Sequence, residues 1–353
     1  MHCTNEPAVT TSAPFRLAIN GYGRIGRCFL RALIEAGVAD HLQVVAINEP
    51  ADFRGIVYLT RFDSTHGRFP GKVEAGDGRL LIDAREIAVT HASTPEEVDW
   101  RAEGVDLVVE CSGQYGSRAE LTRFIDAGCS RVLVSHPANS AEDVDATIVY
   151  GCNEGVLGGG ERIVSNASCT TNAVVPVLDV LLREVGVEQV LLTTLHAAMN
   201  DQPLIDGYHH ADLRRTRSAM QSIIPVSTGL ARGVERLLPA LGGRVQAKAI
   251  RVPTHNVSAI DLVVELSREV TVAEVNALLR AAAEGPQAGR IEYSEEPHAS
   301  IDFNHDGHSA IVDGSQTRVS NGRLVNLLIW FDNEWGFANR MVDVARYWLE
   351  RRG

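Results

Sequence analysis

The chain has 353 residues, of which 45% are hydrophobic and 22% charged, a composition typical of globular proteins at a length that suits two domains. Its net charge of −12 argues against a nucleic-acid partner, because binding to a phosphate backbone depends on basic side chains. No apolar run reaches the roughly 18 residues of a membrane span, and the N-terminus lacks the pattern of a secretory signal. We therefore expect neither a membrane association nor secretion.

The six cysteines are scattered without a CxxC pair, which in a chain of this size indicates free thiols in a reducing compartment. We expect a cytoplasmic protein. Two histidine clusters, at 209–210 and 304–308, allow a metal interpretation, but no third ligand can be placed beside either. We expect no metal. Residues 1–14 are rich in Thr, Ser and Pro and predict a loose extension.

The first predicted unit is a strand over 16–20 that runs directly into "GYGRIG" (21–26). A helix with periodic apolar residues follows and stops at Gly37, and "LQVVAIN" (42–48) predicts a second buried strand. This strand–turn–helix–strand order is the context that a dinucleotide-binding fingerprint requires. A structural glycine turn is the alternative, and the flanking strands favour the binding site.

Each glycine of this turn has a physical role in binding a dinucleotide. Gly21 allows the tight turn, Gly23 lets the backbone approach a pyrophosphate, and Gly26 lets the helix pack on the strand. Arg24 and Ile25 open the helix whose N–H groups would bind the phosphates.

An acidic residue follows the second strand. Glu49 stands 23 residues after Gly26, near the spacing of the carboxylate that accepts hydrogen bonds from the ribose hydroxyls. A carboxylate there would repel a 2′-phosphate. We therefore expect NAD rather than NADP.

Four further apolar segments (105–113, 131–137, 146–151 and 162–166) are typical of parallel strands covered on both faces. Ser112 and Ser135 lie at strand ends, where ligands bind in such sheets, although ordinary turns also use serine. The sequence predicts a doubly wound Rossmann domain over 15–167.

The segment "SNASCTTN" (165–172) places Cys169 at the start of a predicted helix, among small polar residues. Unpaired N–H groups and the helix dipole favour negative charge there, so we expect a lowered thiol pKa and a nucleophilic thiolate. Pro176 lies inside this helix and predicts a kink.

The segments after Cys169 are rich in β-branched residues and predict an α+β catalytic domain over 168–335 with a mixed or antiparallel sheet. We expect the final helix, 336–353, to pack back on the Rossmann domain. His196 lies near the end of a predicted strand over 187–197 and could activate the thiol and accept a proton. A structural histidine is the alternative.

Three arginines cluster at 214–217 in this otherwise acidic chain, and Arg251 lies near a strand end. A solvated loop is one interpretation of the cluster. A phosphate-binding site is the other, because guanidinium groups bind phosphate oxygens in pairs.

The motifs "INGYGRIGR", "SNASCTTN", "TTLHA", "SIIPVSTG", "RVPTHNVSAIDL" and "DNEWGF" occur in the order found in the glyceraldehyde-3-phosphate dehydrogenase superfamily, which the chain resembles over nearly its whole length. "VSHPANS" and "DFNHDGHSAIVDGSQTRVS" resemble its D-erythrose-4-phosphate dehydrogenase branch. The resemblance implies a cytoplasmic homotetramer that oxidises a sugar phosphate aldehyde with NAD in pyridoxal phosphate biosynthesis.

The resemblance also implies roles for individual residues. Cys169 would be the nucleophile and His196 its base, while Asn333 would orient the nicotinamide. The cofactor would contact Gly23, Arg24, Ile25, Glu49, Ser112 and Ser135. The anion sites would be lined by Ser168, Thr170, Arg215, Thr228, Gly229 and Arg251.

The sequence departs from the superfamily's glycolytic pattern at two positions. Met199 replaces a phosphate-binding threonine, which favours water over phosphate as the acyl acceptor, and Glu49 stands where aspartate is commoner. A phosphorylating glyceraldehyde-3-phosphate dehydrogenase is the nearest alternative. A cofactor-free cysteine hydrolase would leave the glycine turn unexplained, and a non-catalytic nucleotide-binding protein would need no thiolate.

Overall fold

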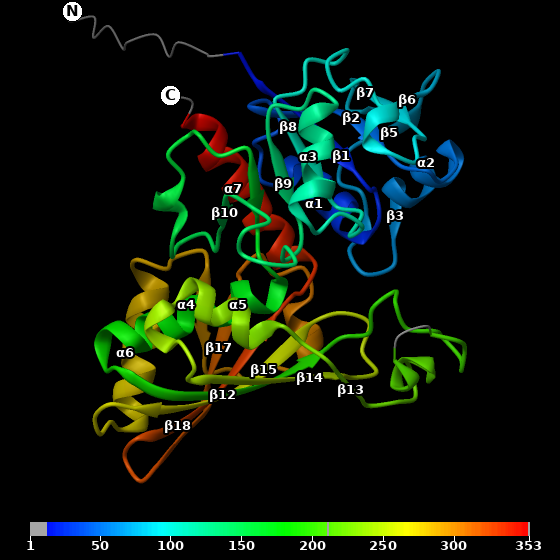
Figure 1. Ribbon diagram of the computed structural model, residues 1–353. Coiled ribbons are helices and arrows are strands. Elements are labelled where there is room, and N and C mark those ends of the chain that lie inside the picture. The colour runs from blue at the N-terminus through cyan, green and yellow to red at the C-terminus, as the bar shows by residue number, and fades with distance from the viewer. Residues whose placement is uncertain (1–12, 210–211, 352–353) are drawn as a thin grey trace, which may run out of the picture.

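The computed structural model describes residues 13–209 and 212–351 (Figure 1). The extension expected over 1–14 falls almost wholly outside these residues, as does His210. Two separate large sheets organise the fold, one built before Cys169 and one after it. Among the described residues, no helix combines the length and the apolar character that crossing a membrane requires.

The first sheet has nine strands in the order β10-β11-β9-β8-β1-β2-β7-β6-β5. The pairs from β10 to β7 are parallel, whereas β7, β6 and β5 pair antiparallel. The strands are β1 (Phe15–Asn20), β2 (Leu42–Asn48), β5 (Val73–Ala75), β6 (Arg79–Ile82), β7 (Arg85–Thr90), β8 (Leu107–Glu110), β9 (Val132–Val134), β10 (Ala146–Thr147) and β11 (Ile163–Ser165). The predicted doubly wound sheet is confirmed.

The order in which strands are added to this sheet changes direction at β1. The chain first adds β2 on one side of β1 and later adds β8 on the other side. Ligands of doubly wound sheets bind at the carboxyl ends of strands beside such a reversal. Gly21, directly after β1, has φ +84° and lies so close to the backbone of Ser112 that a Cβ would meet its nitrogen at 2.4 Å. The glycine turn therefore lies where the sheet is suited to bind a ligand.

Helices α1 (Arg24–Glu35), α2 (Phe53–Arg61) and α3 (Arg118–Asp126) accompany the first sheet. A small hairpin of β3 (Phe62–Asp63) and β4 (Gly67–Arg68) follows α2. The sequence did not predict β3 to β7, because strands of two to six residues without regular alternation carry a weak signal.

The second sheet is mixed, with the order β13-β14-β12-β15-β18-β17-β16. Its strands are β12 (Val187–His196), β13 (Ile224–Val226), β14 (Val245–Arg251), β15 (Ser258–Leu266), β16 (Ile291–Ser294), β17 (Ala310–Ser320) and β18 (Leu324–Phe331). Helices α4 (Cys169–Glu184), α5 (Leu230–Leu237) and α6 (Val272–Glu284) cover one face (Figure 1). The predicted α+β arrangement is confirmed.

Helix α4 continues through Pro176 to Glu184 as one element. The final helix, α7 (Trp335–Glu350), packs against α1, and Met341 and Trp348 are fully buried in one core with Phe29. Residues from the end of the chain thus complete the core of the first sheet. The domain boundaries expected from the sequence stay a prediction.

Substitutions at Gly26 and Gly23 of this turn are expected to affect different properties, the stability of the fold at Gly26 and dinucleotide binding at Gly23. A Cβ on Gly26 would meet the carbonyl oxygen of Gly21 at 2.4 Å, whereas a Cβ on Gly23 would have nothing within 4 Å, at φ −73°. Overpacking costs about 1–3 kcal/mol. We therefore expect Gly26→Ala to lower the melting temperature by several degrees and Gly23→Ala to keep it but weaken dinucleotide binding, as measured by thermal unfolding and titration. Equal melting temperatures for the two variants would contradict this packing argument.

Candidate active site

A strained turn presents Cys169 at the start of α4. Ala167 has φ +58°, a left-handed conformation that costs a non-glycine residue about 1–2 kcal/mol. Its N–H donates to the hydroxyl of Ser165 at 3.1 Å. Ser168 caps the helix by accepting a hydrogen bond from the Thr171 N–H at 3.0 Å. The turn places the thiol of Cys169 at the first position of the helix, as the sequence predicted.

His196, the last residue of β12, lies beside this thiol. Its Nε2 is 3.5 Å from Sγ of Cys169, within reach of proton transfer. Its Nδ1 lies 2.6 Å from Nη1 of Arg251, the last residue of β14, and 2.9 Å from the carbonyl oxygen of Ala197. β12 and β14 are parallel neighbours with His196 opposite Arg251, so sheet register alone brings the two side chains together.

The expectation of a lowered pKa at Cys169 is wrong for this state of the protein. Burial raises the pKa of the Cys169 thiol above its ordinary value, and the Thr170 hydroxyl and the Arg251 charge offset this only in part. The helix N-terminus favours a thiolate, but the desolvation of a buried anion outweighs it.

His196 is neutral at physiological pH in this arrangement. Burial, followed by the charge of Arg251, lowers its pKa to about 4. A guanidinium only donates hydrogen bonds, so the contact with Arg251 requires Nδ1 of His196 to accept. The proton of the neutral ring then lies on Nε2 and points at the sulfur of Cys169. In the other neutral tautomer, in which Nδ1–H would donate to the carbonyl oxygen of Ala197, Nε2 would be a proton acceptor.

A cavity of about 920 Å³ opens in front of Cys169 and His196. It is lined by most of the predicted site residues, namely Arg24, Ile25, Ser135, Ser168, Cys169, Thr170, His196, Thr228, Gly229, Arg251 and Asn333. The amide oxygen of Asn333 accepts a hydrogen bond from the Ser258 hydroxyl at 2.7 Å. The two halves of the chain therefore meet around one cavity, large enough for a cofactor and a small substrate.

The remaining cofactor-binding candidates gather around the turn at the end of β1. One carboxylate oxygen of Glu49 accepts from the Tyr22 N–H at 2.7 Å and the other from the Ala51 N–H at 3.1 Å, which places the carboxylate beside the glycine turn. Ser112 donates from its N–H at 2.7 Å, and from its hydroxyl, to the buried Glu110. Open space beside Gly23 leaves room for a pyrophosphate, so these residues fit a dinucleotide.

Arg215 does not join the other anion-site candidates. Its guanidinium pairs with Asp201 at 3.0 Å and lies 3.8 Å from Asp212, and it is absent from the lining of the cavity. Two carboxylates thus neutralise the cation that the sequence assigned to phosphate. The guanidinium of Arg24 likewise forms ion pairs with Asp63 and Glu334, which leaves only the backbone N–H of Arg24 for the cofactor.

Polar residues that the sequence did not identify also line the cavity, among them Thr194, Arg232, Arg236 and His255. Arg232 and Arg236 stand four residues apart on α5 and share one face of that helix. Two arginines four residues apart, directly after "STG", are a pattern from which a basic face beside the cavity could have been predicted. Within the described ranges Arg232 has no ion-pair partner, and its Nη2 lies 3.6 Å from where a Cβ on Gly229 would be.

Two family models match the chain. The model described as the glyceraldehyde 3-phosphate dehydrogenase NAD-binding domain matches residues 15–118, and the C-terminal domain model of the same family matches 168–333. Together they cover about three quarters of the chain, in the order that the fold requires.

The chain belongs to the glyceraldehyde-3-phosphate dehydrogenase superfamily. It is an oxidoreductase of this superfamily, and NAD is its cofactor. When bound, NAD supplies the acceptor for a hydride.

One group of possible metal ligands lies outside this cavity. Glu292 is brought beside Asp306 and His308, with ligand atoms within 4.8 Å of one another, so a third ligand does exist for the 304–308 cluster. His308 Nδ1 lies 2.8 Å from Asp306 and 3.2 Å from Glu292, and Asp306 raises the pKa of His308. These contacts describe an ion-pair cluster. His209 has a different partner, since its Nδ1 accepts from the Asp212 N–H at 3.1 Å.

The charge of Arg251 acts on both titrating groups. It lowers the pKa of Cys169 and of His196, so Arg251→Gln should raise both. The measurement is the rate of iodoacetamide alkylation of Cys169 against pH without NAD, with peptides identified by mass spectrometry. Arg244→Gln is the control, because Arg244 pairs with Glu188 at the surface. An alkylation profile that stays in place or moves to lower pH in Arg251→Gln would refute the assignment.

Proposed function

We propose that this protein oxidises D-erythrose 4-phosphate to 4-phospho-D-erythronate with NAD and that water releases the acid, a reaction of pyridoxal phosphate biosynthesis. The observation that carries the proposal is Met199, which lines the cavity of Cys169 and His196 at the position where the glycolytic pattern has threonine. We further propose a cytoplasmic homotetramer, on the resemblance to the superfamily.

The chemistry begins at Cys169. Its sulfur attacks the aldehyde carbon, and the resulting thiohemiacetal loses a hydride to leave a thioester on the cysteine. The thiol proton would pass to the oxygen that becomes negative during attack, and the backbone N–H of Cys169 would donate a hydrogen bond to that oxygen.

Arg251 links substrate binding to the base. Its guanidinium is shared between His196 and the cavity, and burial lowers its pKa, so a phosphate ester would be a better partner than a neutral imidazole. Moving Arg251 toward the phosphate frees Nδ1 of His196 to donate to Ala197. Nε2 can then accept a proton, first from the thiohemiacetal hydroxyl and later from the attacking water.

The unpaired cation Arg232, with the exposed residues Thr228 and Gly229, supports a site for the substrate phosphate. Met199 is 46% exposed, and a thioether has no proton to donate to a second phosphate. Losing one donor to a charged group costs about 1.5–3 kcal/mol, or roughly ten- to a hundred-fold in affinity. Water therefore competes well with inorganic phosphate for the thioester.

A phosphorylating glyceraldehyde-3-phosphate dehydrogenase is the second candidate. Thr170, Thr228 and Arg232 all line the cavity and could hold inorganic phosphate beside the thioester. The two candidates differ in the acceptor and in the length of the aldehyde, and both are decided by the same assay.

We expect NADH to form from D-erythrose 4-phosphate in phosphate-free buffer, faster than from glyceraldehyde 3-phosphate, with the free acid as product. Met199→Thr restores a donor and should increase phosphate-dependent turnover about tenfold. Ile205→Thr, at a 77% exposed residue outside the cavity lining, is the matched control. The measurements are NADH absorbance with and without phosphate, and product analysis.

An absolute need for phosphate together with an acyl phosphate product would establish the glycolytic reaction instead. The absence of NADH from both aldehydes, with NAD binding intact, would contradict any role in sugar phosphate oxidation.

A further inference from the structure

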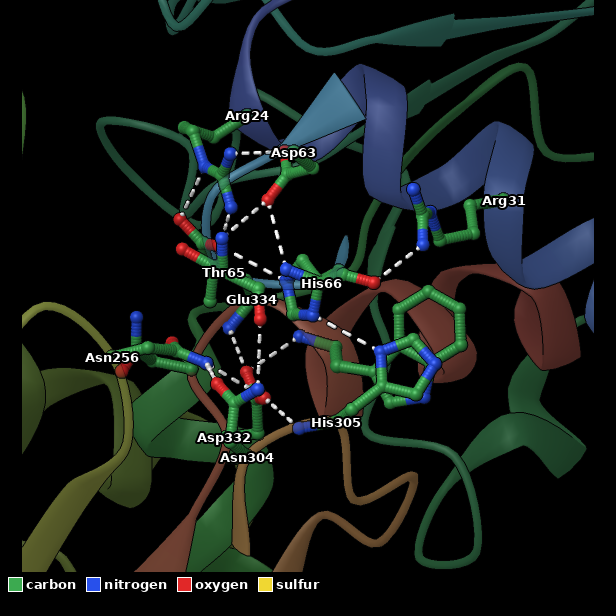
Figure 2. A network of polar contacts seen from close by, with 12 residues as sticks. Arg24, Arg31, Asp63, Thr65, His66, Asn256, Asn304, His305, Asp332 and Glu334 are labelled. Carbon is green, nitrogen blue, oxygen red and sulfur yellow. Dashed lines mark hydrogen bonds and ion pairs between the residues drawn. The ribbon is translucent and has the colours of Figure 1, made fainter. Parts of the chain in front are cut away.

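Two histidines from distant parts of the chain lie next to each other, beside Glu334, which lines the cavity (Figure 2). His66, in the β3–β4 turn, places Nδ1 3.0 Å from Nδ1 of His305, which precedes β17. The Nε2 atom of each ring contacts a carboxylate. Nε2 of His66 lies 3.1 Å from Glu334, and Nε2 of His305 lies 2.8 Å from Glu35. The side chain of His66 is only 1% exposed, whereas that of His305 is 32% exposed.

These three contacts fix how many protons the histidine pair carries. An ionised carboxylate only accepts hydrogen bonds, so both Nε2 atoms must carry a proton. The contact between the two Nδ1 atoms needs one proton, donated by one ring and accepted by the other. The pair of His66 and His305 therefore holds three protons and a single positive charge. A fourth proton would set two N–H groups against each other at 3.0 Å, and loss of one would set two lone pairs against each other.

Other charged and titratable groups surround the pair on every packed element. Helix α1 contributes Arg24, Cys28, Arg31 and Glu35, β3 contributes Asp63, and the segment between β18 and α7 contributes Asp332 and Glu334. The guanidinium of Arg31 donates to the carbonyl oxygens of His66, at 2.7 Å, and of Gly67, at 2.9 Å. Asp63 accepts from the N–H groups of Thr65 and His66, both at 2.9 Å.

The histidine pair is joined to both ends of the cofactor site. Glu334, the partner of His66, also pairs with Arg24, whose Nε donates to it at 2.8 Å, and Arg24 opens the helix after the glycine turn. Glu334 directly follows Asn333, and both line the cavity. On the other side, Asp332 accepts from the backbone N–H groups of His305 and Glu334, at 2.8 and 2.9 Å.

We propose that His66 and His305 are positioning residues for the NAD site: the singly charged pair holds Glu334 between the glycine turn and Asn333 and so fixes the two ends of the cofactor cavity relative to each other. Removing a nitrogen contact of this pair should therefore weaken NAD binding, because Glu334 loses part of the network that holds it.

The test is NAD binding by calorimetry at neutral pH, without any aldehyde, so that its result is independent of the proposed substrate. His305→Phe keeps a ring to stack on Trp335, which His305 contacts at 3.8 Å between centroids, and removes both nitrogen contacts. We expect its dissociation constant for NAD to rise about tenfold, with an unchanged melting temperature.

Glu35→Gln removes only the outer carboxylate and should cause a smaller loss of affinity. His298→Phe is the control, since His298 is an exposed residue on a neighbouring segment and should leave the affinity unchanged. A His305→Phe protein of unchanged melting temperature that binds NAD with wild-type affinity would overturn the proposal. So would a loss of affinity that comes with a lower melting temperature, because that result describes packing alone.

Discussion

The approach of the Cys169 sulfur to Nε2 of His196, at 3.5 Å, is the contact on which the account of this protein depends. It joins the turn that leaves the first sheet to the end of a strand in the second. Neither half of the chain contains the site alone, because β11 and α4 position the thiol while β12 and β14 position the imidazole and Arg251. The left-handed conformation of Ala167 and the helix cap by Ser168 are local features that place the sulfur of Cys169 beside His196.

Electrostatics at this contact favour the neutral forms of both groups. Burial disfavours both the thiolate and the imidazolium, and the positive charge of Arg251 further disfavours the imidazolium while it favours the thiolate. In the proposed reaction, a phosphate ester bound to Arg251 would weaken the effect of that charge on His196 and raise the pKa of this base.

Much of this arrangement could be predicted from the sequence, because its signals are local. The glycine turn, Glu49 and the helix start at Cys169 each combine a residue type with a backbone conformation, and the structure has them in the expected elements. The thiol pKa was predicted wrongly, because burial depends on residues from both sheets. The sequence also did not indicate that Arg215 pairs with Asp201, fourteen residues away in the chain, and lies outside the cavity lining, so its phosphate-binding role stays a prediction. His66 and His305 are 239 residues apart in the chain, so no local sequence pattern could predict their contact.

The central claim, that Cys169 becomes covalently acylated, is tested most directly by intact-protein mass spectrometry. The protein would be mixed with NAD and D-erythrose 4-phosphate in phosphate-free buffer, quenched in acid, and then digested to locate any added mass. The account predicts an acyl adduct on the peptide that carries Cys169, absent in Cys169→Ser and absent without NAD. An adduct located on another cysteine, or NADH formation by Cys169→Ser at the wild-type rate, would contradict it.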